Sequence, residues 1–289
     1  MFTIEDQQLK ITIHPKGAEL QSIFHKGLSL EYMWNGDPAF WGKHSPILFP
    51  IVGTLKDDTY IYKGKPYKLG RHGFARDRVF EVESRQPDAI TFLLKSDADS
   101  RINYPFDFEL RIHYALLAGG LRTSWSVKNS SGEELYFSIG GHPAFKVPLV
   151  TGTDYTDYYL QFDKKETAHR WPISPQGLIE KGSLPVLEKS DRLPLTKELF
   201  SADALVFKHL ASTAVSLRSD KTPHGFRMDF PDYPFLGIWA AKNADFVCIE
   251  PWCGIADSVD SDQQWTTKEG IEELAPGEIF ERSWTLTLF

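Results

Sequence analysis

The sequence contains very little cysteine: only Cys248 and Cys253 occur among 289 residues. Four residues separate them and no matching pair occurs elsewhere, so the spacing is a poor match to a structural zinc site. The pattern is more typical of two small, buried, apolar side chains in a reducing cytoplasm. We therefore expect no metal at these cysteines.

Long apolar runs and excess positive charge are also missing. No stretch approaches the roughly 18 apolar residues that a membrane-spanning helix needs, and residues 1–6 lack the charged-then-apolar pattern of a signal peptide. The formal net charge is −7, whereas nucleic-acid binding needs a basic face that neutralises phosphates. We expect a cytoplasmic protein that binds neither membranes nor nucleic acids.

Helical periodicity is scarce, and the dominant apolar period is two. Strand-like runs separated by turn residues occur at 9–14, 89–94, 108–114, 121–127, 246–250 and 282–289. Short helical turns fit only at 197–204 and 267–273, and the irregular stretch 145–194 predicts long loops. With no linker or repeat, the sequence predicts one all-β domain over residues 1–289, an antiparallel sandwich or barrel.

Two polar residues stand in unusual surroundings. Glu250 lies within the apolar run 246–252, and burial without a cation raises a carboxyl pKa, which suits an acid or base working near neutral pH. His142 follows Gly140 and Gly141 and precedes Pro143, which restricts the histidine to extended backbone and fixes the direction of its imidazole. A carboxylate paired with an arginine and a core histidine in a tight turn are the structural alternatives.

Other polar residues allow a functional and an ordinary interpretation. Arg71 and His72 lie between glycines and Arg76 follows, so this loop suits hydroxyl or phosphate oxygens, or it is a basic surface turn. Lys56 and Asp203, taken alone, are typical of solvated charges. No phosphate-binding glycine loop, nucleophile elbow or His-Glu-x-x-His motif occurs, so nucleophilic and hydride chemistry lack support.

Three segments, taken together, resemble the aldose 1-epimerase (galactose mutarotase) superfamily, and most of all its bacterial LacX-like branch. The resemblance extends over nearly the whole chain and implies a large twisted antiparallel β-sandwich with an open cleft on one concave sheet. It implies no metal and no cofactor. The segments are His72-Gly73-Phe74-Ala75-Arg76, Gly140-Gly141-His142-Pro143-Ala144-Phe145 and Cys248-Ile249-Glu250-Pro251-Trp252.

The resemblance also implies roles for single residues. His142 matches the general acid that protonates the ring oxygen of a pyranose, and Glu250 matches the base that takes the proton of the C1 hydroxyl. The ring would open to the aldehyde and close again on the other face. His72 and Asp203 match residues that hold sugar hydroxyls, and Trp239 looks like an aromatic platform beside the site.

One position departs from the galactose mutarotases, which carry an arginine where Lys56 is the nearest equivalent in this chain. A lysine keeps the charge but loses the planar two-pronged donor geometry, so the sugar need not be galactose. The His-Gly-Phe-Ala-Arg segment is shared with hexose-6-phosphate epimerases of the same superfamily. Arg76, with Arg71 or Lys56, would then bind a sugar phosphate.

The sequence leaves three classes of function. The first is an aldose 1-epimerase acting on a free or phosphorylated hexose, and the second is a non-catalytic carbohydrate-binding protein on the same scaffold. The third, a lyase or hydrolase, needs a second carboxylate opposite the first, for which Asp203 is the only obvious candidate. The acid/base pair favours the first class. We expect a monomer or homodimer whose partner is a small-molecule sugar or sugar phosphate.

Overall fold

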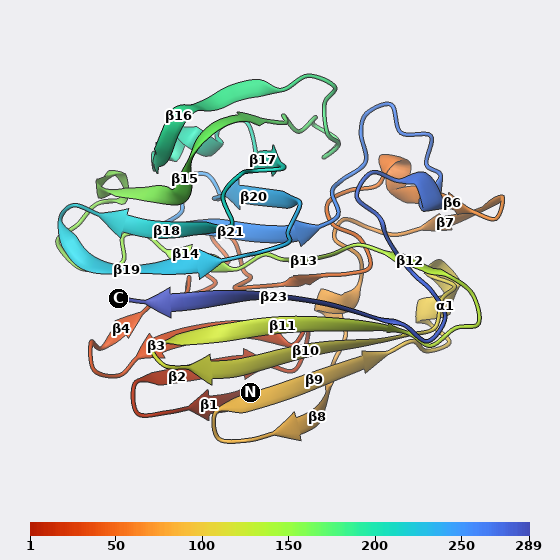
Figure 1. Ribbon diagram of the computed structural model, residues 1–289, viewed down its shortest axis with the longest axis horizontal. Helices are drawn as coiled ribbons and strands as arrows, with labels where there is room; N and C mark the ends of the chain where they lie inside the picture. The colour runs from red at the N-terminus through yellow and green to blue at the C-terminus, as the bar shows by residue number, and fades with distance from the viewer.

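The computed structural model describes all residues from 1 to 289, and its regular secondary structure is almost entirely antiparallel strands (Figure 1). The largest sheet has nine strands. In spatial order they are β16 (Leu184–Pro194), β15 (Tyr158–Arg170), β18 (Ala214–Ser219), β19 (Thr222–Asp229), β23 (Ile279–Leu288), β11 (Gly120–Asn129), β10 (Phe108–Leu117), β9 (Ala89–Lys95) and β8 (Glu81–Arg85).

A second sheet of six strands carries the candidate site. Its order is β17 (Leu205–Lys208), β20 (Phe235–Trp239), β21 (Phe246–Cys253), β13 (Ile139–Gly141) and β5 (Ile47–Leu48), and β14 (Ala144–Lys146) also pairs with β21. The central strand β21 is buried along its whole length, as expected of a strand covered on both faces.

Smaller elements complete the fold. A four-stranded sheet contains β1 (Phe2–Glu5), β2 (Leu9–His14), β3 (Glu19–His25) and β4 (Leu30–Glu31). Two-stranded pairs are β6 (Thr59–Tyr62) with β7 (Lys65–Lys68), and β12 (Leu135–Phe137) with β22 (Glu272–Leu274). Helical segments are α1 (Ser100–Asn103) and the 3₁₀ turns η1 (Lys56–Asp58), η2 (Ala75–Asp77), η3 (Tyr155–Asp157), η4 (Lys197–Phe200) and η5 (Trp265–Thr267). No helix is long and apolar enough to cross a membrane.

Side-chain alternation explains the large sheet. In β10, Phe108, Leu110, Ile112 and Tyr114 are buried while the residues between them are partly exposed, because successive side chains point to opposite faces of a strand. These residues belong to a core cluster of 66 buried residues that lies between the sheets. The β-sandwich and the six strands predicted from apolar patterns are thus confirmed.

The stretch 145–194 is a correction, since it contains two of the longest strands, β15 and β16, where the sequence predicted loops. β16 is the edge strand of the nine-stranded sheet and is mostly exposed, so it needs little apolar sequence and its pairing with β15 is not visible as periodicity. The turn predicted at 197–204 forms over Lys197–Phe200, whereas the one at 267–273 lies earlier, over Trp265–Thr267, and β22 begins at Glu272.

Candidate active site

The floor of the site is an indole ring that lies across the six-stranded sheet. Trp252 and Glu250 are two residues apart on β21 and therefore share one face of the sheet. Gly140 of β13 and Gly237 of β20 flank this strand. A Cβ at Gly140 would lie 2.5 Å from Trp252 Cδ1, and one at Gly237 would lie 2.4 Å from Trp252 Cη2. Both neighbours must be glycine for the ring to lie flat.

The two residues predicted as acid and base meet above this floor. His142 comes directly after β13, and its backbone N–H donates to the Pro46 carbonyl at 3.1 Å. Its Nε2 lies 3.3 Å from Glu250 Oε2, and the two side chains are 11% and 2% exposed. Residues 108 positions apart in the sequence therefore form one pair, slightly wider than the roughly 2.6–3.2 Å of a proton-transferring hydrogen bond.

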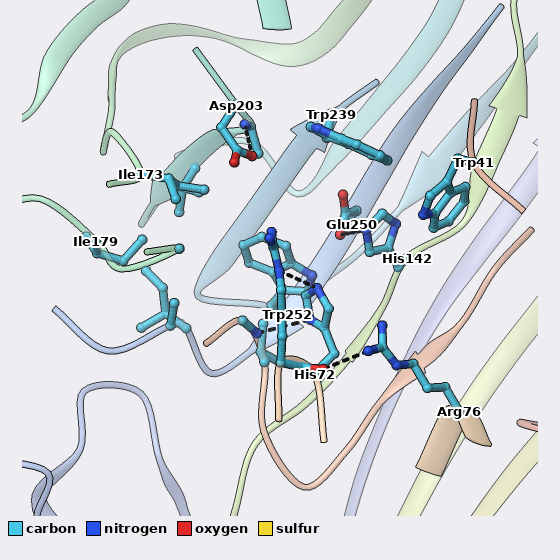
Figure 2. A pocket seen from close by; sticks show the side chains of 18 residues that line it. Trp41, His72, Arg76, His142, Ile173, Ile179, Asp203, Trp239, Glu250 and Trp252 are labelled. Atoms are coloured by element: carbon cyan, nitrogen blue, oxygen red, sulfur yellow. Dashed lines mark hydrogen bonds and ion pairs between the residues drawn. The ribbon is translucent and has the colours of Figure 1, made fainter. Parts of the chain in front are cut away.

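Aromatic rings enclose this pair. The Trp41 ring stacks on the His142 imidazole, with centroids 4.8 Å apart and planes at 26°. Trp239, at the end of β20, meets the same imidazole edge-on at 5.6 Å, and His72 does so at 5.7 Å from another side. Figure 2 shows Trp239 above the pair, Trp41 to its right and His72 below it. The imidazole is thereby fixed in orientation and shielded from water.

A cavity of about 340 Å³ opens beside the pair, within the range of roughly 300–1,000 Å³ typical of small-molecule sites. Its wall is mixed, with aromatic and aliphatic side chains next to a few polar groups. It is lined by Trp41, Val52, Gly53, Arg71, His72, Arg76, His142, Ile173, Gly177, Ile179, Asp203, Ala204, Val206, Trp239, Glu250, Trp252, Ile255 and Ala256.

Burial favours the neutral forms of both members of the pair. It lowers the pKa of His142 from 6.5 to about 3, and it raises the pKa of Glu250 well above 4.5, because a charge in a dry site loses its hydration. Both shifts favour a neutral imidazole beside a protonated carboxyl over an ion pair, so one transferable proton is shared by the two groups. Two groups this close titrate as a unit. With the shared proton on the carboxyl, Glu250 would act as the acid, and with the proton on the imidazole, His142 would act as the acid and Glu250 as the base.

Several buried polar atoms of the cavity residues have no hydrogen-bond partner within the protein: His142 Nδ1, Glu250 Oε2, Trp252 Nε1 and Arg76 Nε. Leaving such groups unpaired costs free energy. Native proteins accept that cost mainly at functional sites, where a ligand supplies the missing partners. These atoms suit a ligand with several oxygen atoms.

His72 is a neutral hydrogen-bond donor. The ring atom Nδ1 accepts the Gly53 backbone N–H at 3.1 Å, and the backbone N–H of His72 donates to the Gly53 carbonyl at 2.8 Å. Burial lowers the pKa of His72 well below 6.5, so one ring nitrogen alone carries a proton. Arg71 Nε also approaches Nε2, at 3.3 Å and in donor geometry. Because a neutral imidazole accepts at one nitrogen only, we assign the acceptor role to Nδ1, which has the shorter contact, and the proton to Nε2.

Comparison with known proteins gives consistent matches over the whole chain. The family model of aldose 1-epimerase matches residues 1–272. The chromosomal protein LacX of Lactococcus lactis subsp. lactis is 36% identical, over 99% of this chain and 98% of the relative. The chain belongs to the aldose 1-epimerase family. The LacX-like resemblance noted from the motifs is thus confirmed.

Solved structures agree with this assignment. A galactose mutarotase related enzyme from Lactobacillus acidophilus is 40% identical, covers 100% of this chain and 97% of its own, and superposes with a TM-score of 0.95. A galactose mutarotase-like protein from Lactobacillus casei is 33% identical over 100% of both chains, with a TM-score of 0.94. The similarity includes every strand that forms the cavity.

In this member of the family, most of the predicted site residues line one cavity. Asp203 stands just before β17 with φ of 69°, and its Oδ1 accepts the neighbouring Ala204 N–H at 2.7 Å, which leaves its other oxygen for a ligand. Arg71 and Arg76 both line the cavity, and Arg76 donates to the Arg71 backbone carbonyl at 2.8 Å. Figure 2 shows Asp203 across the cavity from Arg76.

Lys56 is an exception and corrects the sequence-based expectation. Its ammonium donates to the Ser261 carbonyl at 3.1 Å, and it is not among the residues that line the cavity. It lies in η1 (Lys56–Asp58), three residues beyond Gly53, where the chain no longer lines the cavity. The cations at the cavity are Arg71 and Arg76.

Sequence reasoning missed residues that come from irregular segments. Trp41 lies in the loop between β4 and β5, and Ile173 and Ile179 lie between β15 and β16. No local pattern relates these positions to the Glu250 segment. Trp252 could have been found, because an aromatic residue two positions from a functional carboxylate on one strand must share its face.

His142, Cys248 and Glu250 also offer three potential metal-ligand atoms within 4.8 Å of one another. A metal would need the Cys248 thiolate. Burial raises the pKa of this thiol well above 9.0, which disfavours that form. The arrangement suits proton transfer better than metal binding.

Proposed function

We propose that the protein is an aldose 1-epimerase that interconverts the α and β anomers of a hexopyranose. The observation that carries the proposal is the 3.3 Å approach of His142 Nε2 and Glu250 Oε2 at the edge of a cavity of sugar size. The ring oxygen and the C1 hydroxyl of a pyranose are both attached to C1, so two adjacent proton carriers can reach both oxygens at once.

The reaction needs one proton delivered and one removed. One member of the pair protonates the ring oxygen while the other takes the proton of the C1 hydroxyl, the C1–O5 bond breaks, and the free aldehyde forms. Rotation about C1–C2 followed by the reverse transfers closes the ring with the opposite configuration. By family resemblance His142 is the acid and Glu250 the base. The sugar oxygens stabilise the charged forms that burial disfavours.

The remaining cavity residues would bind the sugar. The Trp252 indole offers a flat apolar surface to the C–H face of the ring, and Trp239 closes the side beside His142. His72 Nε2 can donate to a hydroxyl, and the free oxygen of Asp203 can accept from one. This combination of stacking and hydrogen bonds selects a polyhydroxylated ring.

A phosphorylated hexose is the second candidate, favoured by Arg71 and Arg76, which both line the cavity. Neither cation pairs closely with a carboxylate, since Arg76 Nε lies 3.7 Å from the exposed Asp77 and Arg71 has no ion-pair partner at all within 4.0 Å. Two guanidinium groups suit a phosphate. If the substrate is a 6-phosphate, Arg76→Ala abolishes a strong preference for phosphates over free hexoses.

Anomer exchange followed by NMR over a panel of hexoses and their 6-phosphates tests the proposal. We expect His142→Ala to lower the exchange rate by about 10²–10⁴-fold. An unchanged rate would refute the acid/base roles. Sugar binding without any exchange in the unmutated protein would instead favour a non-catalytic carbohydrate-binding protein.

A further inference from the structure

Asp257 and Lys268 form a buried ion pair directly behind the cavity wall. Lys268 Nζ lies 3.2 Å from Asp257 Oδ1, and each side chain is 4% exposed. The same ammonium donates to the carbonyl of Ile255, a residue that lines the cavity. Neither charged residue touches the cavity itself, so the pair has no direct part in proton transfer.

Asp257 ties two other wall segments to this pair. Its N–H donates to the Thr54 carbonyl at 2.9 Å, and its Oδ2 accepts the Lys56 N–H at 2.9 Å. Its carbonyl accepts the Ile179 N–H at 2.8 Å. One residue therefore connects the segment that follows Gly53 with the adjoining segment that carries Ile179.

The connection continues to His72 through Gly53. Gly53 makes both of its backbone hydrogen bonds with His72, as described above. It also has φ of 73°, and a Cβ there would lie 2.5 Å from the Cβ of Ala256, the residue preceding Asp257. Such close packing means that a shift of the Asp257 segment displaces Gly53, and with it the imidazole of His72.

We propose that the Asp257–Lys268 pair positions His72 and two adjoining segments of the cavity wall. Removing one partner leaves an uncompensated buried charge, and the segment must move to hydrate it. His142 and Glu250 make no hydrogen bond or ion pair with either residue. We therefore expect the ion pair to affect sugar binding more than proton transfer. This inference rests on the proposed function, which supplies the sugar and the reaction.

Lys268→Met and the double variant Asp257→Asn/Lys268→Met test this positioning role. The single variant leaves the Asp257 carboxylate buried without a counter-charge. We expect KM to rise about tenfold or more, while kcat per folded enzyme changes less than about threefold. The double variant removes both charges but keeps an amide oxygen that can accept from the Lys56 N–H. We expect its KM to return to within about threefold of the original.

Glu166→Gln is the matched control. Glu166 is likewise a buried carboxylate, 5% exposed, that accepts the backbone N–H groups of Ala211 and Ser212. None of these residues lines the cavity. This variant should lower the melting temperature without changing KM. A Lys268→Met protein with a lowered melting temperature and an unchanged KM would overturn the proposal, since the pair would then only stabilise the fold.

Amide hydrogen exchange gives a measure that needs no substrate. In Lys268→Met, exchange at Lys56 and Ile179 should accelerate more than in Glu166→Gln, because those two N–H groups bind Asp257. Equal protection in both variants would also overturn the proposal. If the unmutated protein did not interconvert anomers, the proposed function would fail. The amide hydrogen-exchange data would still decide whether the ion pair positions the cavity wall.

Discussion

The nine-stranded sheet and the six-stranded sheet bury their side chains in different ways. In β10 buried and partly exposed residues alternate, so one face packs on the core and the other faces water. In β21 all eight residues are buried, although one of them, Glu250, carries a carboxyl group. The first sheet gains stability from apolar burial, whereas the second accepts a cost in stability for polar groups that face a cavity.

Glu250→Gln separates these two roles most strongly. Without the carboxyl that shares a proton with His142, kcat should fall by about 10²–10⁴-fold. The free energy of unfolding should stay unchanged or rise, because an amide has no charged form that burial penalises. NMR anomer exchange and urea denaturation measure the two quantities. A large loss of stability would mean that the carboxyl serves the fold.

Leu110→Ala is the opposite experiment, in the nine-stranded sheet. Leu110 is fully buried in β10, so its truncation should lower the free energy of unfolding by about 2–5 kcal/mol. It does not line the cavity, and kcat per folded molecule should not change. The neighbouring Glu109→Gln, on the partly exposed face, should cost no more than about 1 kcal/mol. A reduced kcat in Leu110→Ala would show that the two sheets are coupled.

The same contrast explains how much could be predicted from sequence. Alternation revealed β2, β10 and β11, because one face of each packs on the core. It failed for the exposed edge strand β16, whose residues pair through the backbone and need no apolar pattern. Edge strands are held by ladder hydrogen bonds, and these leave little trace in a sequence.

Local pattern pointed most strongly to two members of the candidate site, and the family resemblance supplied roles for others. Gly140, Gly141 and Pro143 marked His142, and the apolar run marked Glu250. Their approach to 3.3 Å depends on the pairing of β13 with β21, which local pattern does not encode. Lys56 was misplaced for the same reason, since its distance from the cavity depends on where η1 leaves the wall.

Gly237→Ala should disturb the cavity floor without reaching the proton carriers directly. The new Cβ would lie 2.4 Å from the Trp252 ring, which must tilt into the cavity, at a cost in unfolding free energy of about 1–3 kcal/mol. We expect KM for the sugar to rise more than kcat falls. Gly132→Ala, where a Cβ meets nothing within 4 Å, is the control. Equal kinetics in both variants would contradict the floor role of Trp252.

Trp41→Ala should have the smallest effect, a change in the pH profile. Burial is the main cause of the lowered pKa of His142, and Trp41 provides one stacked face of that burial. Without the indole, water reaches the imidazole and its pKa rises toward 6.5. Activity is lost when the pair takes up a second proton, so the acid limb of kcat/KM should move to higher pH. Trp41→Phe keeps an aromatic face and should leave the limb near its original position. A limb unmoved in Trp41→Ala would mean that the six-stranded sheet alone keeps the imidazole dry.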